Sequence, residues 1–183
     1  MRIVAGELGG RRLLAPRGDG VRPTTDRVRE ALFSILGEVD GLDVLDLFAG
    51  TGALGLEALS RGARSVALID TDPVPARANA EALGVEDRVR IVRSEALSFL
   101  RRRAEGGDRY DLVFLDPPYR LARPLGPDLS KLLPTHLREG ARVVVESAAD
   151  SPVDLDHVAL PLLDERRYGS TLLRIHGTAE APR

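Results

Sequence analysis

Short apolar runs that alternate with helical stretches dominate the pattern of hydrophobic and polar positions along this chain. Five runs carry few polar residues, as parallel strands buried on both faces do, and they span 43–48, 65–69, 89–92, 112–115 and 141–145. Helical spacing fills the intervals near 53–61, 73–83, 95–104 and 125–137, and three of these helices are followed by Gly62, Gly84 and Gly140 as expected caps. This alternation predicts an α/β fold with one open, doubly wound, mostly parallel sheet.

The two ends of the chain depart from this alternation. Residues 158–163 and 168–176 have no clear helix between them, so we expect an antiparallel hairpin that completes the sheet. Near the N-terminus, apolar runs at 3–5 and 13–15 are separated by glycines, which indicates a second hairpin. We expect residues 1–183 to form a single domain, with residues 1–20 as an N-terminal hairpin appendage.

Composition excludes several classes of protein. The 183 residues are 43% hydrophobic and 30% charged, which suits an ordinary globular domain with one core. No stretch approaches the ~20 consecutive apolar residues of a membrane-spanning helix, and no signal peptide is recognisable, so we expect a cytoplasmic protein. The chain has no cysteine and its three histidines are scattered, so we expect no metal site.

Positive charge is concentrated near the N-terminus. The formal net charge of the chain is -2, whereas residues 1–30 hold seven arginines against four acids, a net charge of +3. A basic segment of this kind is suited to contacts with nucleic-acid phosphates. The candidate contacts in it are Arg2, Arg11, Arg12, Arg22 and Arg27.

A glycine-rich loop follows the first buried run, at the strand end where open α/β sheets bind their ligands. Gly50, Gly52 and Gly55 have G-x-G-x-x-G spacing, and glycines there let a ligand approach the backbone closely. Asp46 lies inside the apolar run, where an ionised carboxylate needs a partner such as a bound ammonium or the amides of the loop.

Acids also follow the next two runs. Asp70 is placed to accept hydrogen bonds from the hydroxyls of a ribose, and Glu95 to accept one from an adenine amino group. These features fit both NAD and S-adenosylmethionine, and Asp46 favours the methyl donor because its amino-acid tail carries an ammonium. The expected cofactor-binding residues are Asp46, Phe48, Ala49, Gly50, Thr51, Gly52, Asp70, Glu95 and Ala96.

The fourth run leads into the stiff loop Asp116-Pro-Pro-Tyr119, in which two prolines fix φ and lack amide hydrogens. The carboxylate of Asp116 and the carbonyl of Pro117 can accept both hydrogens of an amino group, and Tyr119 offers a flat face on which a base stacks. We therefore expect Asp116, Pro117 and Tyr119 to be catalytic and Pro118 to contact a nucleic-acid substrate.

This loop resembles the motif of methyltransferases that act on exocyclic or amide nitrogens. Together, the segments 22–33, 48–63, 116–119 and 167–169 closely resemble the RsmD-type 16S ribosomal RNA guanine-N2 methyltransferases, over residues 2–176. The resemblance implies a seven-stranded, Rossmann-like class I methyltransferase fold with an antiparallel last strand and an N-terminal hairpin. It also implies methyl transfer from S-adenosylmethionine to a guanine of 16S ribosomal RNA, in the small subunit or its assembly intermediate, by a monomer that needs neither metal nor membrane.

Three other functions agree with parts of the sequence. A DNA adenine-N6 methyltransferase would also act on an aromatic exocyclic amine. An NAD-dependent dehydrogenase would explain the glycine loop and Asp70 but would give residues 116–119 no role. A catalytically silent RNA-binding protein would need neither the loop nor the acids.

Overall fold

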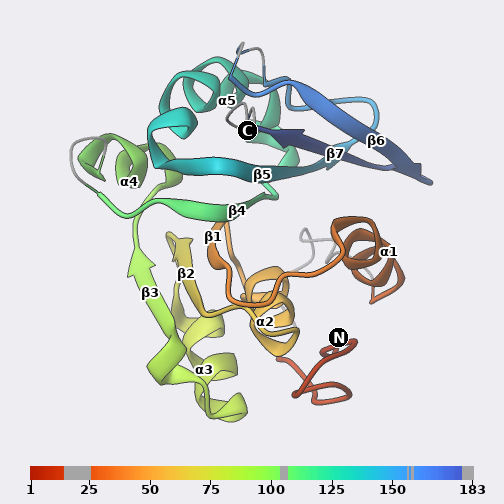
Figure 1. The fold of residues 1–183 in the computed structure, drawn as a ribbon, viewed down its shortest axis with the longest axis vertical. Coiled ribbons are helices and arrows are strands. Elements are labelled where there is room, and N and C mark those ends of the chain that lie inside the picture. Colours follow the sequence, from red (N-terminus) through yellow and green to blue (C-terminus); the bar gives the residue numbers. More distant parts are fainter. Residues whose placement is uncertain (15–25, 104–106, 156, 158, 179–183) are drawn as a thin grey trace.

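A seven-stranded sheet in the order β3-β2-β1-β4-β5-β7-β6 runs through the computed structural model (Figure 1). The structure describes residues 1–14, 26–103, 107–155, 157 and 159–178, without the side chains of residues 103 and 119–123. The strands are β1 (Asp43–Leu47), β2 (Ser65–Asp70), β3 (Val89–Arg93), β4 (Tyr110–Leu115), β5 (Leu137–Ala148), β6 (Leu162–Tyr168) and β7 (Thr171–Gly177). Strand β7 pairs antiparallel with β5 and β6, and the other pairs are parallel. The predicted fold class is therefore confirmed.

Helices cover both faces of the sheet. They are α1 (Asp26–Leu36), α2 (Ala53–Ser60), α3 (Val74–Leu83), α4 (Ala96–Arg103) and α5 (Tyr119–Leu132), with short 3-10 turns η1 (Glu86–Arg88) and η2 (Leu133–His136). Apolar side chains of α1, α2 and α3 belong to one core cluster, and those of α4 and α5 belong to a second. Among the described residues, no helix is long and apolar enough to cross a membrane.

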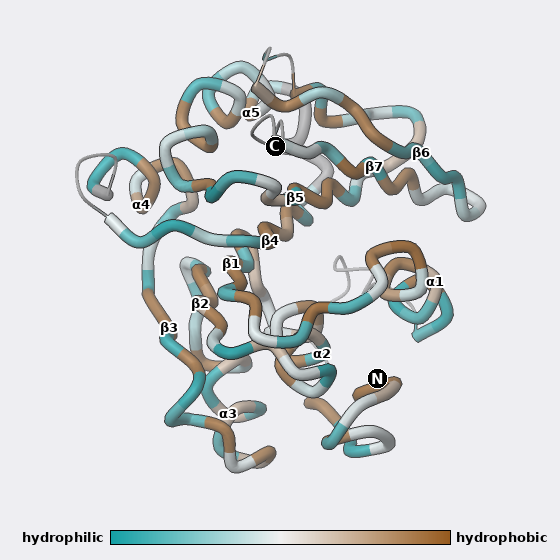
Figure 2. The backbone as a smooth tube through the Cα atoms, in the orientation of Figure 1, coloured by the Kyte–Doolittle hydropathy of each residue, from teal (hydrophilic) through white to brown (hydrophobic). Residues whose placement is uncertain are grey.

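The central strands β1, β2, β4 and β5 appear in the sequence as continuous apolar runs because each contributes side chains to both core clusters. In β4, Leu112 and Phe114 pack into the core beneath α1 and α2, whereas Val113 and Leu115 pack into the core beneath α4 and α5. Figure 2 shows the brown, hydrophobic colour in the central strands. This double burial is the feature that the sequence pattern detected.

The region around α5 differs from the prediction. Helix α5 begins at Tyr119 rather than near 125, and its pattern was obscured by Pro124 and Pro127, which a helix interior normally excludes. Gly140 is not a helix cap as expected: with φ 71° it lies inside β5, where the pairing with β4 is irregular between Tyr110 and Leu112. Strand β5 continues through this irregularity to Leu137, which pairs with Tyr110, so it starts four residues earlier than predicted.

The C-terminal hairpin is present, but the limits predicted for its first strand were wrong. The strand begins at Leu162 and includes Asp164, Glu165, Arg166 and Arg167. Strand β6 is one of the two outer strands of the sheet and is exposed along most of its length. Because β6 buries few of its side chains, it carries no apolar run that a pattern could reveal.

The N-terminal segment, residues 1–14, turns back on itself through a single antiparallel bridge between Arg2 and Arg12. Residues 15–20 of the predicted hairpin lie outside the described part of the chain. Ile3 and Leu13 are buried in the core cluster of α1, α2 and α3. Two apolar side chains of this segment are therefore part of the domain core, whereas most of its other described residues are exposed.

Candidate cofactor and amino-group site

Strand register brings the predicted site residues to one edge of the sheet. Leu47, the last residue of β1, pairs with Ile69 of β2 and with Leu115 of β4. The residues that follow, Phe48, Asp70 and Asp116, therefore leave the sheet side by side at the carboxyl ends of three adjacent strands. This edge is where open α/β sheets bind their ligands.

The end of β3 joins the same edge. The amide of Ser94 donates to the carbonyl of Asp70 over 3.0 Å, so the turn after β3 lies against the end of β2. Glu95 is exposed in this turn, and Ala96 is the buried first residue of α4. Glu95 and Asp70 thus lie at neighbouring strand ends, as the sequence predicted.

The glycine loop makes a tight turn between β1 and α2. The amide of Gly52 donates to the carbonyl of Ala49 over 2.7 Å, and the amides of Phe48 and Ala49 both donate to the carbonyl of Ile69. Phe48 has a φ of 71°, a conformation that is costly for a residue with a side chain. Strain of this kind is concentrated at ligand sites in proteins.

Two glycines of the loop have different roles. A Cβ atom at Gly55 would lie 2.6 Å from Leu68 and 2.7 Å from Val66, so this glycine permits close packing of α2 on β2. At Gly50, with φ 54°, no described atom lies within 4 Å of such a Cβ. The first glycine of the loop is therefore open to a ligand, whereas the last one serves the fold.

Asp46 lies beneath the loop with 2% of its surface exposed. Its Oδ2 accepts a hydrogen bond from the amide of Gly55 over 3.0 Å, which is one of the partners expected from the sequence. Burial raises the pKa of Asp46 to about 7, and this effect is opposed by the Gly55 hydrogen bond and increased by the charge of Asp70. Asp46 thus joins β1 to the first turn of α2.

Asp70 holds the loop from the neighbouring strand. Its Oδ2 accepts from the amide of Gly50 over 2.7 Å, and its Oδ1 accepts from the amide of Asp72 over 2.9 Å. A carboxylate has about four acceptor positions, so Asp70 retains capacity for the hydroxyls of a ribose.

A buried amide that sequence reasoning missed supports the loop from α3. Asn79 is fully buried, and its Nδ2 donates to the carbonyl of Thr51 over 2.9 Å. Its Oδ1 accepts from the amide of Leu14 over 2.7 Å, so one side chain joins the glycine loop to the N-terminal segment. The available signal was a polar residue on the apolar face of a helix, beside Ala76 and Ala80.

A second missed group attaches the N-terminal segment to α2. The fully buried carboxylate of Glu57 accepts from the amides of Val4 and Ala5 over 2.7 and 3.0 Å, and from Nε of Arg61 over 2.7 Å. The hydroxyl of Ser60 accepts from the amide of Leu8. The C-terminal half of the 48–63 motif therefore binds the chain's own backbone, whereas its first half forms the cofactor loop.

The Asp-Pro-Pro-Tyr loop follows β4 beside the glycine loop. Asp116 is partly buried, Pro117 is buried and Pro118 is exposed. Pro118, with φ -51°, precedes α5, so Tyr119 is the first residue of that helix. The side chain of Tyr119 lies outside the described residues, so its stacking role stays a prediction.

The N-terminal arginines do not form one cluster. Arg2 is exposed, with Nε 3.4 Å from Asp26 at the start of α1. Arg11 instead donates to the carbonyls of Leu83 and Ala82 at the end of α3. This end of α3 lies shortly before the start of β3, toward the amino ends of the parallel strands. Arg12 and Arg27 are exposed, whereas Arg22 lies outside the described part of the chain.

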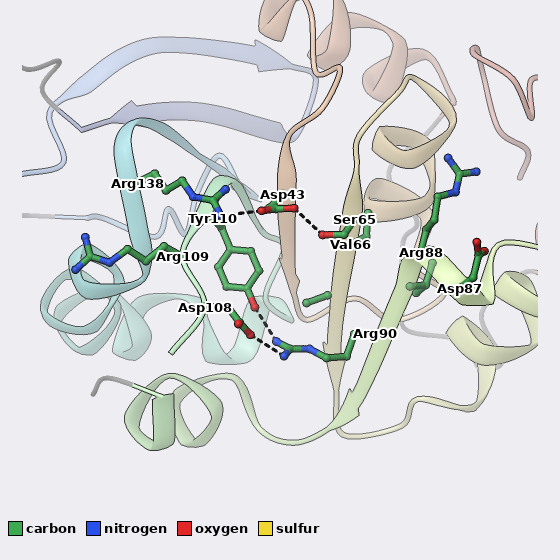
Figure 3. A pocket seen from close by; sticks show the side chains of 12 residues that line it. Asp43, Ser65, Val66, Asp87, Arg88, Arg90, Asp108, Arg109, Tyr110 and Arg138 are labelled. Atoms are coloured by element: carbon green, nitrogen blue, oxygen red, sulfur yellow. Dashed lines mark hydrogen bonds and ion pairs between the residues drawn. The ribbon is translucent and has the colours of Figure 1, made fainter. Parts of the chain in front are cut away.

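A hollow of about 380 Å³ lies at the amino ends of β1, β2, β3 and β4, away from these residues (Figure 3). Its charged side chains bind one another: Arg90 contacts Asp108 over 2.7 Å, and Arg138 contacts Asp43 over 2.7 Å. A hydrogen bond from Arg64, with others from Ser65 and Arg138, holds the pKa of Asp43 well below its usual range despite partial burial. These pairs hold the amino edge together, and the hollow is not where such sheets bind cofactors.

The fold and the site define a class I, Rossmann-like methyltransferase. The chain belongs to the family described as Conserved hypothetical protein 95, which matches residues 1–177. It is 38% identical to the Ribosomal RNA small subunit methyltransferase D of Escherichia coli K12, over 96% of this chain and 89% of that one. The protein of the same name from Haemophilus influenzae is 33% identical, over 96% of this chain and 93% of the relative. The solved structure of the yhhF protein of Escherichia coli is 38% identical, with a TM-score of 0.84 over 98% of each chain.

Proposed function

We propose that this protein transfers a methyl group from S-adenosylmethionine to the exocyclic N2 of a guanine in 16S ribosomal RNA. The observation that carries this proposal is the position of Asp116 and Pro117 at the end of β4, directly beside the glycine loop at the end of β1. The names of the Escherichia coli and Haemophilus influenzae relatives, which span nearly the whole chain, support small-subunit ribosomal RNA as the substrate.

The residues at the carboxyl edge fit the cofactor. Gly50 is open to a ligand, and the amide of Gly55 is taken by Asp46, so the amides of Ala53 and Leu54 at the start of α2 are the ones suited to the carboxylate of an amino-acid tail. Asp70 would bind the ribose and Glu95 the adenine, with Phe48, Ala49, Thr51, Gly52 and Ala96 as further contacts. When bound, S-adenosylmethionine supplies an electrophilic methyl group on a positively charged sulfur.

The Asp116 loop would prepare the nucleophile. The Asp116 carboxylate and the Pro117 carbonyl accept the two hydrogens of the guanine amine, which draws its lone pair out of conjugation with the ring. Tyr119 stacks on the base and Pro118 lies against it. The gain in rate then comes mainly from positioning two reactants in line.

The substrate would be the small ribosomal subunit or an assembly intermediate of it. The protein would act on this substrate in the cytoplasm, as a monomer. The target base must leave its stack at a cost of a few kcal/mol unless it is already unpaired. The exposed guanidinium groups of Arg2, Arg12 and Arg27 would offset this cost by phosphate contacts. Arg11, which holds the end of α3, is expected to contribute least.

Two titrations and a substrate comparison test the proposal. Calorimetry should detect S-adenosylmethionine binding and no tighter binding of NAD; the reverse result would favour the dehydrogenase. Methyl transfer to small-subunit RNA should exceed transfer to adenine-containing DNA of equal length. An Asp116→Ala variant is the control, since it should bind the cofactor normally and transfer poorly.

A further inference from the structure

The tip of the C-terminal hairpin, residues 166–170, has no role in the site described above. It contains Arg167, Tyr168 and Gly169, one of the segments that resemble the methyltransferase family. In Figure 1 the hairpin of β6 and β7 extends outward beyond β5, and in Figure 2 the second half of β6 is coloured as hydrophilic. Burial does not account for Arg166 or Arg167, because both side chains are exposed.

Strand register places the tip at the catalytic edge of the sheet. Leu115 at the end of β4 pairs with Val145, but β5 continues for three more residues to Ala148, which pairs with Thr171 beside the tip. At ~3.3 Å per residue, the start of the tip lies ~10 Å past the level of Leu115, the residue before Asp116. The tip joins β7, two strands across from β4, to β6, three strands across, so Arg166 and Arg167 lie a further ~14 Å away at ~4.8 Å per strand. The tip therefore projects beside the Asp116 loop, on the side away from the glycine loop.

The guanidinium group of Arg167 has most of its donors available. Nε donates to the carbonyl of Gly169 over 3.0 Å. An arginine side chain has five N–H donors, four of them on its two terminal nitrogens. Within the described part of the chain, these four donors of Arg167 have no hydrogen-bond partner, and its guanidinium group forms no ion pair. Arg166 is also exposed and contacts only Asp164, at 3.2 Å, among the described acids. Other charges of the hairpin are paired, as Arg174 is with Glu165 over 2.7 Å.

The backbone of the tip is held in place from one side. Tyr168 is partly buried and packs against the core cluster of α1, α2 and α3. Gly169 has a φ of 62°, which permits the turn. The tip is thus anchored while Arg166 and Arg167 face solvent, an arrangement that limits the conformational entropy lost on binding.

We propose that the hairpin tip is an RNA-binding arm, in which Arg167 and Arg166 contact phosphates of the ribosomal RNA strand that leads to the target guanine. This inference rests on the proposed function and extends it by a second contact surface, separate from the N-terminal segment.

The experiment compares Arg167→Glu with Arg109→Glu, which makes the same charge change at an exposed arginine at the amino end of β4. Methylation kinetics are measured with small-subunit RNA at several salt concentrations, together with cofactor affinity. Arg167→Glu should raise the KM for RNA about tenfold and lower the salt slope of RNA binding by about one. Its kcat at saturating RNA and its cofactor affinity should stay near wild type, and Arg109→Glu should change little.

A third variant separates RNA contact from a structural role of the arginine. Arg167→Lys keeps the charge but loses the Nε bond to Gly169, so it should retain most of the RNA affinity. If Arg167→Lys were as defective as Arg167→Glu, or if Arg167→Glu matched Arg109→Glu, the inference would be overturned. Failure of the proposed function would look different, because the wild-type protein itself would then transfer no methyl group to RNA.

Discussion

Replacing Asp46 by asparagine should make the protein more stable at neutral pH while weakening its cofactor site. Burial raises the pKa of Asp46 from 3.8 to about 7, and each pKa unit is worth ~1.4 kcal/mol, so ionising the folded-state carboxyl costs on the order of 4 kcal/mol. Asparagine avoids this cost and keeps an oxygen for the Gly55 amide. Its unpaired NH2 group costs ~1–3 kcal/mol, which leaves a net gain of ~2 kcal/mol above pH 7.

The pH dependence of the free energy of unfolding distinguishes a buried, ionisable Asp46 from other causes of a stability change. Between about pH 4 and pH 7 the folded state holds a proton that the unfolded chain has lost, so wild-type stability falls as pH rises through this window and levels off above it. Urea unfolding at pH 5 and pH 8 should therefore show the free-energy difference moving by ~2–3 kcal/mol in favour of Asp46→Asn. Asp87→Asn, at an exposed acid, is the control. An Asp46→Asn difference that is the same at both pH values would refute the reasoning.

Three further changes test other parts of the structure. Asp70→Ala should weaken S-adenosylmethionine binding by ~1–3 kcal/mol in calorimetry through loss of charge-assisted hydrogen bonds, and unchanged affinity would remove Asp70 from the site. Asn79→Asp keeps an acceptor for Leu14 but loses the donor to Thr51, so it should weaken cofactor binding about tenfold; a normal dissociation constant with a lower melting temperature would mean that Asn79 only stabilises the fold. Asp43→Asn should destabilise the protein by ~2 kcal/mol at pH 7 in urea unfolding. Because the folded-state pKa of Asp43 is lowered, that loss should shrink as pH falls below 4, and a constant loss down to pH 3 would contradict the assignment.

The parts of the fold that the sequence revealed are those in which one local pattern has one structural cause. Strands β1, β2 and β4 are apolar because both faces are buried, and Gly84 ends α3 in the left-handed conformation that glycine favours. Strand β6 was predicted with the wrong limits because most of its residues are exposed and form no apolar run. Helix α5 was predicted near 125–137 and its start at Tyr119 was missed because its prolines contradict the usual rule for helix interiors.

The site was predictable as far as it depends on strand ends. Asp46, Asp70 and Asp116 were identified because each follows or interrupts an apolar run, and register then brings them together. Asn79 and Glu57 act on backbone groups 28 to 65 and 52 to 53 residues away, and local spacing carries no information about such distant partners. Long-range hydrogen bonds of this kind can be identified only once the three-dimensional fold is known.

The most direct test of the central claim is the identity of the methylated nucleoside. Small subunits from cells lacking this protein are incubated with the purified protein and S-adenosylmethionine, and the RNA is digested and analysed by mass spectrometry. We predict N2-methylguanosine in 16S ribosomal RNA, formed at least a hundredfold more slowly by Asp116→Ala, about the effect of removing one positioned polar group from an active site. Methylation of adenine instead, or undiminished N2-methylguanosine with Asp116→Ala, would contradict the account.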